Sequence, residues 1–186
     1  MNDAQQRGFR VLLLPGWLNS GPGHWQTRWE QLHGFARVDQ ADWEWPRRGD
    51  WMARLDEVLL SDERPAVLVA HSLGCHLVAA WAAHSQHTTR VRGALLVAPP
   101  DVERAGTPPQ LRQWCPAIRA RLPFAATVLY SDDDPYGTPA CARALAADWG
   151  AQATSVGPAG HVNGDSGLAD WPAGLDHLQA LCARAP

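Results

Sequence analysis

Short apolar runs alternate along the chain with longer stretches in which apolar residues recur at helical spacing. The apolar runs, rich in Val, Leu and Ala, predict strands at residues 10–14, 36–39, 66–70, 93–97, 126–130 and 152–156. Helical periodicity predicts helices near residues 25–32, 50–60, 73–85, 139–149 and 173–183. This alternation predicts an α/β fold, and strands that are apolar throughout are typical of a sheet buried on both faces. We therefore expect a mostly parallel central sheet of about six strands with helices on both faces.

Length and composition are typical of a small soluble protein. With 186 residues, 46% hydrophobic and 19% charged, the chain is long enough for a sizeable core and predicts a single domain over residues 1–186. No apolar run approaches the roughly 20 residues that span a bilayer, and residues 1–10 lack the features of a signal peptide. We therefore expect no membrane association and a cytoplasmic location. A net charge of −3 without a basic block gives no indication of a nucleic-acid partner. Nothing in the sequence indicates the oligomeric state.

Two absences narrow the chemistry. All 16 basic residues are arginine, so Schiff-base chemistry, a Ser-Lys dyad and a Walker-A lysine are excluded. The four cysteines, at positions 75, 115, 141 and 182, form no C-x-x-C pair, and neither H-x-x-x-H nor H-E-x-x-H occurs. We therefore expect no metal site and no cofactor.

The stretch VLVAHSLGCHL, residues 67–77, predicts a strand, a sharp turn at Ser72 and a helix. This is the organisation of a nucleophile elbow, in which the strand and helix nearly touch and the flanking residues must be small. Gly74 meets that requirement, whereas Ala70 replaces the usual first glycine of G-x-S-x-G with one extra methyl group. The alternative is that Ser72 simply caps the following helix.

A catalytic serine needs a base and an acid to orient that base. His161 in PAGHVNG follows the sixth predicted strand, and the aspartates of YSDDDPYG follow the fifth. Serine, aspartate and histidine thus occur in the order typical of this elbow, at the strand ends where sites of parallel sheets lie. Pro135 holds its predecessor in an extended conformation and so favours Asp134 over Asp132 and Asp133. Local sequence alone does not decide among the three.

The loop PGWLNSGPGHW after the first predicted strand is the expected source of an oxyanion hole. One donor is the backbone N–H of Leu73, directly after the serine, and the other is that of Trp17. A competing Ser20–His24 pair lies in the same loop, but no strand and helix flank Ser20 as an elbow requires. The residues expected to contact the substrate are Gly16, Trp17 and His71.

Ten tryptophans are a high number for this length. Trp29, Trp81 and Trp149 lie in predicted helices and are expected in the core. The tryptophans in or beside predicted loops could wall an apolar acyl pocket or pack into the core; they are Trp17, Trp25, Trp43, Trp45 and Trp171. The Pro-rich segment 99–123 is a candidate for a short flap and is too short for a lid domain.

Several stretches together resemble a known family of small serine hydrolases. They are LLLPGWLNSGPGHWQTRWE, VDQADWEWP, LVAHSLG, VLYSDDDPYGTPACARALAADWGA and VGPAGHVNGDSGLADWPAG, and they span nearly the whole chain. The family, of the α/β-hydrolase superfamily, is typified by YdeN and retinoblastoma-binding protein nine. The resemblance implies a compact α/β-hydrolase fold with little or no lid, with Ser72 as nucleophile, His161 as base and Asp134 as acid. Because the L-x-C-x-E motif is absent, a retinoblastoma-type partner is not expected.

These features predict a cofactor-independent serine hydrolase that cleaves small ester or amide bonds through an acyl-enzyme. The expected type is carboxylesterase-like, with peptidase or thioesterase activity as variants. One alternative is a non-catalytic binding or regulatory module on the same fold. Another is lyase or oxygenase chemistry that uses His161 as base without an acyl-enzyme. The sequence does not identify the physiological substrate.

Overall fold

The computed structural model describes residues 8–184. Its strands are β1 (Arg10–Leu14), β2 (Ala36–Arg37), β3 (Ala66–His71), β4 (Val91–Val97), β5 (Ala125–Tyr130) and β6 (Gln152–Ser155). Its helices are α2 (Trp25–His33), α3 (Arg48–Leu60), α4 (Leu73–His84), α5 (Pro139–Trp149) and α6 (Pro172–Arg184), with short 3₁₀ helices η1 (Thr88–Arg90), η2 (Pro109–Trp114) and η3 (Gly164–Ser166). Residues 1–7 and 185–186 of the predicted domain lie outside the described residues, and the single domain over 1–186 stays a prediction.

The elements confirm the predicted α/β fold, with small differences at the ends. The predicted strand 36–39 is paired over two residues, although the Val38 N–H still donates to the Leu13 carbonyl oxygen at 2.9 Å. β4 begins two residues earlier than predicted, at Val91. The three short 3₁₀ helices were not predicted, because segments of three to six residues are too short to show a clear period.

All neighbouring strands are parallel, in the order β2-β1-β3-β4-β5-β6. The order reverses between β1 and β3, because β2 lies on one side of β1 and the later strands lie on the other. In open parallel sheets, ligands bind past the carboxyl ends of the strands at such a reversal. The loops after β1 and β3 therefore meet at the expected place for a site.

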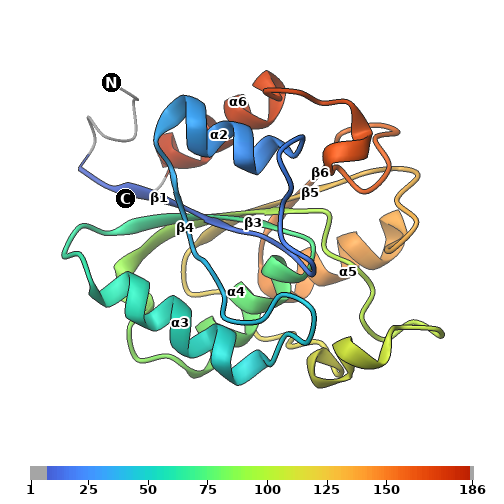
Figure 1. The fold of residues 1–186 in the computed structure, drawn as a ribbon, viewed down its shortest axis with the longest axis horizontal. Helices are drawn as coiled ribbons and strands as arrows, with labels where there is room; N and C mark the ends of the chain where they lie inside the picture. Colours follow the sequence, from blue (N-terminus) through green and yellow to red (C-terminus); the bar gives the residue numbers. More distant parts are fainter. Residues whose placement is uncertain (1–7, 185–186) are drawn as a thin grey trace.

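Helices cover both faces of the sheet, with α2 and α6 on one side and α3, α4 and α5 on the other (Figure 1). Side chains along β1 alternate between the two layers. Leu12 and Leu14 belong to the core formed with α3, α4 and α5, whereas Val11 and Leu13 belong to the core formed with α2 and α6. This explains why the strands are apolar at successive positions.

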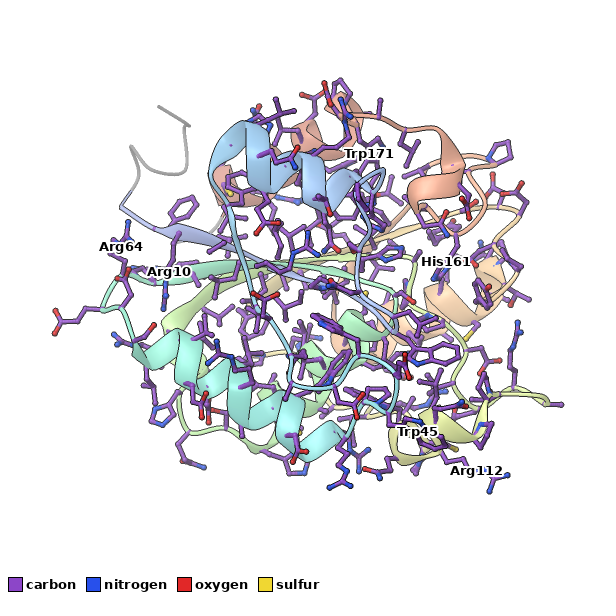
Figure 2. The ribbon with its side chains drawn as sticks, viewed as in Figure 1. Arg10, Trp45, Arg64, Arg112, His161 and Trp171 are labelled. Carbon is purple, nitrogen blue, oxygen red and sulfur yellow. The ribbon has the colours of Figure 1, made fainter. Side chains whose placement is uncertain are left out.

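Most tryptophans are buried in these two cores. The predicted core residues Trp29, Trp81 and Trp149 are each at most 1% exposed, which confirms that prediction. Trp25, on α2, and Trp171, just before α6, are also buried, and their ring centroids lie 4.9 Å apart. Figure 2 shows Trp171 in the layer of α2 and α6. None of the helices within residues 8–184 combines the length and apolar character needed to cross a membrane.

Candidate active site

Ser72 lies at the sharp turn between β3 and α4. Its backbone has φ 54° and ψ −123°, a strained conformation for a residue other than glycine. The turn is held by the Ser72 N–H, which donates to the Val97 carbonyl oxygen at 2.9 Å. The Ser72 side chain makes no capping hydrogen bond to α4. The chain therefore forms a sharp strand-turn-helix elbow at Ser72, and the Ser72 side chain does not cap α4.

Two glycines let the backbone segments approach closely at this turn. A Cβ atom added to Gly74 would lie 2.3 Å from the Leu14 carbonyl oxygen, so the start of α4 packs directly on the end of β1. A Cβ atom added to Gly16 would lie 2.7 Å from Ser72 Cβ and 3.1 Å from Ser72 Oγ. Ala70 is fully buried in the core with α3, α4 and α5, which accommodates its methyl group.

The three predicted side chains meet past the ends of β3, β5 and β6. His161 Nε2 lies 2.8 Å from Ser72 Oγ, and His161 Nδ1 lies 2.9 and 3.0 Å from the two carboxylate oxygens of Asp134. These partners require the proton on Nδ1, which leaves Nε2 free to accept from the Ser72 hydroxyl. The Asp134 side chain is 3% exposed and that of His161 is 10% exposed. Figure 2 shows His161 at the opposite end of the sheet from Arg10 and Arg64.

The neighbouring aspartates have other partners. Asp133 accepts hydrogen bonds from Ser131 Oγ at 2.7 Å and from the Gly160 N–H at 2.8 Å, and these donors lower the pKa of its carboxyl group. Asp132 accepts from Ser155 Oγ at 2.7 Å. Asp133 thus holds the loop that carries His161, while Asp134 alone among the three is bonded to its imidazole.

His71, the residue before the serine, holds the backbone of His161 through a hydrogen bond. Its Nε2–H donates to the His161 carbonyl oxygen at 2.9 Å, and the two rings lie 4.9 Å apart. Burial, followed by the nearby His24 and His161, holds the pKa of His71 well below its usual value. The imidazole is therefore neutral, and its second nitrogen carries no proton.

The two predicted oxyanion donors are unengaged. Within residues 8–184, neither the backbone N–H of Trp17 nor that of Leu73 donates a hydrogen bond, whereas the Trp17 indole N–H donates to the Glu44 carbonyl oxygen at 2.9 Å. Leu73 is the first residue of the 12-residue helix α4, so its N–H belongs to the positive end of the helix dipole. Because Gly16 lies close to Ser72, the backbone of the following residue, Trp17, lies beside the Ser72 hydroxyl. This arrangement can stabilise negative charge that develops on an oxygen next to Ser72.

A cavity of about 590 Å³ lies at Ser72. Of the three residues predicted to contact the substrate, Trp17 and His71 line this cavity, whereas Gly16 lies against Ser72 and is not part of its wall. Their contact with a substrate stays a prediction. Its apolar wall is formed by Trp17, Leu18, Val102, Pro108 and Leu111. Its polar lining includes Asn19, His24, Arg104, Asn163 and Asp165.

The segment predicted as a flap forms one side of this cavity. Residues 100–102, 104, 106–108 and 111 line it. The segment is fastened where it begins, because the His76 Nε2–H donates to the Pro100 carbonyl oxygen at 2.8 Å. The Asp101 N–H also donates to the Tyr136 carbonyl oxygen at 2.9 Å, which joins the segment to the loop of Asp134.

The competing Ser20–His24 pair does not form. The Ser20 hydroxyl donates to Gln26 Oε1 at 2.7 Å, and His24 Nδ1 accepts from the Gln26 N–H at 3.1 Å. His24 therefore caps α2, and Ser20 is engaged in the interior. Within residues 8–184, no group of three or more His, Cys, Asp and Glu side chains is arranged to hold a metal ion.

Comparison with known proteins places this geometry in a family. The family model described as serine hydrolase matches residues 11–180. This chain belongs to the serine hydrolase family. A search of curated proteins found no match.

Solved structures agree with this assignment, and the chain is similar to YdeN-like hydrolases. A protein described as a YdeN-like hydrolase from Pectobacterium atrosepticum is 25% identical, with a TM-score of 0.84 over 96% of this chain and 92% of that chain. The ydeN gene product of Bacillus subtilis is 22% identical, with a TM-score of 0.72 over 95% and 100% of the two chains. An esterase from Rhodococcus is 15% identical, with a TM-score of 0.70 over 97% and 92%. The last two show likeness of fold.

The sequence of this serine hydrolase did not reveal the residues that support the site. Trp25 was a candidate for a pocket wall, but its Nε1–H donates to the Val162 carbonyl oxygen at 2.8 Å, next to His161. Gln26, which is fully buried, donates from its amide to the Val69 carbonyl oxygen at 3.0 Å and to that of Leu14 at 3.4 Å, and so joins β3 to β1. The only sequence signal was the motif GHWQTRWE, whose polar residues stand at the start of a helix.

Proposed function

We propose that this serine hydrolase cleaves small ester or amide bonds, with Ser72 as nucleophile, His161 as base and Asp134 as the group that orients the base. The observation that carries the proposal is the continuous line of hydrogen bonds from Ser72 Oγ through His161 to Asp134, at 2.8 and 2.9 Å. A line of this kind activates a serine hydroxyl, which is a weak nucleophile by itself.

In this mechanism Ser72 Oγ attacks the carbonyl carbon of the substrate while its proton moves to His161 Nε2. Asp134 keeps the imidazole in the required tautomer and stabilises the imidazolium that forms. The N–H groups of Trp17 and Leu73 donate to the oxyanion, each contributing about 3 kcal/mol to the stability of the transition state. His161 then gives its proton to the leaving alcohol or amine, and an acyl-enzyme on Ser72 remains. Water activated by His161 releases the acid.

The dimensions of the cavity favour small-molecule substrates. A volume of about 590 Å³ falls within the range of sites that hold drug-sized ligands. The apolar wall suits the acyl chain of a carboxylic ester, and the same geometry accommodates thioesters and amides. We therefore assign a carboxylesterase-like activity, with thioesterase or peptidase activity as variants of the same chemistry.

The proposal is tested by labelling wild type and Ser72→Ala with a fluorophosphonate probe and assaying both on p-nitrophenyl esters of increasing chain length. We expect the wild type to gain the mass of the probe on Ser72, and the variant to lose about 10³- to 10⁶-fold in kcat. A variant that kept wild-type turnover and labelling would contradict the proposal. A wild type that is inert and unlabelled would indicate a binding module, and turnover without an acyl adduct would indicate lyase-type chemistry.

A further inference from the structure

Behind the loop that carries Trp17, the side chain of Arg37 forms a dense set of hydrogen bonds. Arg37 is the last residue of β2, at the edge of the sheet, and its side chain is 9% exposed. Its Nη1 donates to Asn19 Oδ1 at 2.6 Å and to the Ser20 carbonyl oxygen at 2.9 Å. Its Nη2 donates to Thr27 Oγ1 at 2.7 Å and to Glu30 Oε2 at 2.9 Å, and its Nε donates to the same Glu30 oxygen at 3.1 Å.

The residues that Arg37 holds belong to two structures that meet at the site. Asn19 and Ser20 end the oxyanion loop, which we define as residues 16–20. Thr27 and Glu30 lie on α2, which packs on the sheet above this loop (Figure 1). Arg37 therefore ties the loop to α2 and to the edge of the sheet at the same time.

The oxyanion loop has a backbone conformation that needs such support. Leu18 and Asn19 both have φ 66°, in the left-handed region that residues other than glycine rarely adopt. Within the loop, the Asn19 N–H donates to the Gly16 carbonyl oxygen at 3.1 Å, which closes a turn around Trp17. Asn19 Oδ1 accepts from both the Ser20 N–H, at 2.7 Å, and Arg37. The direction of the Trp17 N–H thus depends on a turn whose far end is held by the guanidinium.

Arginine suits this position better than lysine. The acceptors lie on four different residues, and the planar fork of the guanidinium has five N–H donors in fixed directions. Glu30 supplies the carboxylate that compensates the mostly buried positive charge. Arg37 does not line the cavity, so its effect on a substrate is transmitted through the loop.

We propose that Arg37 is a positioning residue for the oxyanion hole: by holding Asn19 and Ser20, it directs the Trp17 N–H at the oxygen of the substrate carbonyl. This inference rests on the proposed function. An oxyanion donor acts mainly in the transition state, so a misaligned donor lowers kcat and leaves KM nearly unchanged. Arg37 has no contact with His161 or Asp134, so the pH dependence of kcat stays where it is.

The test compares four variants on p-nitrophenyl butyrate, with phenylboronic acid as an inhibitor that forms a tetrahedral adduct on Ser72. Arg37→Lys keeps a positive charge for Glu30 but loses the fork. Asn19→Gly keeps the freedom for positive φ and the Arg37–Glu30 pair, but removes the loop's side-chain acceptor. Asn19→Asp keeps that acceptor. Arg28→Met is the matched control, because Arg28, on α2, is paired with Asp170 just before α6 and touches no part of the loop.

For Arg37→Lys and Asn19→Gly we expect kcat to fall about 10- to 100-fold, part of the loss seen when an oxyanion donor is removed. For Arg37→Lys, which alters no residue of the cavity lining, we expect KM to stay within about two-fold. For both variants we expect the boronate Ki to rise by a factor similar to the loss in kcat. Asn19→Asp should retain more activity than Asn19→Gly. Arg28→Met should lower the thermal midpoint but leave kcat and the boronate Ki near wild type.

The inference is overturned if Arg37→Lys and Asn19→Gly keep kcat and boronate Ki near wild type. It is also overturned if they change only in thermal midpoint, as the control does, because that marks a purely structural role. These outcomes leave the proposed function standing as long as Ser72→Ala is inactive. If Ser72→Ala turns over like wild type, the proposed function fails and this inference fails with it.

Discussion

At the scale of single residues, Ser72, His161 and Asp134 are each held in place by further contacts outside the triad. Asp134 uses one carboxylate oxygen for both His161 Nδ1 and the Tyr136 N–H, the latter at 2.8 Å, so its carboxylate cannot rotate away. His161 is held through its own carbonyl oxygen by His71. Ser72 has strained backbone angles, and its backbone N–H donates to the Val97 carbonyl oxygen. Reactivity at this site therefore also depends on the groups that hydrogen-bond to the three triad residues.

The role of Asp134 can be separated from that of its neighbours by an isosteric change. We expect Asp134→Asn to lower kcat by about 10³- to 10⁴-fold, because an amide fails to hold the imidazole in the tautomer that accepts from Ser72. Asp132→Asn is the control, since Asp132 is bonded to Ser155 and not to His161. Initial rates on p-nitrophenyl butyrate, with circular dichroism to check folding, measure both. Equal losses in the two variants would refute the assignment of Asp134.

The close contact at Gly16 leads to a second expectation. A methyl group there meets Ser72 Cβ at 2.7 Å, so the loop or the serine must shift. Because displacements of about 1 Å can cost roughly 10²-fold in rate, we expect Gly16→Ala to lower kcat by about that factor. Gly49→Ala in α3 serves as the comparison, since a Cβ atom there meets nothing within 4 Å. Wild-type kcat in Gly16→Ala would show that the contact relaxes without consequence.

At the scale of elements, α2 supports the site although none of its residues carries the proposed chemistry. Its first turn contributes a cap from His24, a bond from Trp25 to the His161 loop and a bridge from Gln26 between β1 and β3. The helix thus fixes the loop of His161, and the ends of β1 and β3, relative to one another.

The same helix shows what the sequence could and could not predict. Its existence followed from helical periodicity, and the strands followed from apolar runs, because burial on both faces leaves a local pattern. Ser72, Asp134 and His161 could be proposed because each lies in the turn or loop that follows a strand. The bond from Trp25 to Val162 joins residues 137 positions apart, and no local period encodes it. For that reason Trp25 and Trp171 were left between a pocket wall and the core.

We expect Trp25→Phe to weaken the clamp between α2 and the His161 loop. The change keeps an aromatic ring, although a smaller one, and leaves the buried Val162 carbonyl oxygen without its donor, a loss of about 1–3 kcal/mol in unfolding free energy. We also expect kcat to fall several-fold as His161 loosens. Trp45→Phe is the matched change on a ring that is 55% exposed. Urea denaturation and initial rates test this, and identical behaviour of the two variants would contradict a role for the Trp25–Val162 bond.

At the scale of the whole molecule, the site concentrates buried imidazoles on one end of the sheet. His24, His71 and His76 are each at most 5% exposed, and all three accept or donate hydrogen bonds to fixed backbone groups. Burial lowers the pKa of His24 to about 3 and that of His76 to about 4, and holds the pKa of His71 well below its usual value. The folded protein therefore keeps three neutral histidines at a pH where the unfolded chain would protonate them.

This difference makes stability depend on pH with a definite sign. Histidines of the unfolded chain titrate near pH 6.5, so below that pH the unfolded state binds up to three more protons than the folded state. The unfolding free energy that depends on these residues is fully present above about pH 7 and falls as pH decreases through 6.5 towards the folded pKa values, about 4 for His76 and about 3 for His24. Each contributes a slope of about 1.4 kcal/mol per pH unit, or about 4 kcal/mol per unit for three.

Urea denaturation followed by tryptophan fluorescence at pH 7.5, 6.5, 5.5 and 5.0 measures the slope. His76→Gln, which keeps a neutral donor near the Pro100 carbonyl oxygen, should reduce the slope by about one third. An unfolding free energy that stays constant from pH 7.5 to 5.0 would mean that these imidazoles gain protons without unfolding, and that the end of the sheet around Ser72 opens to admit water.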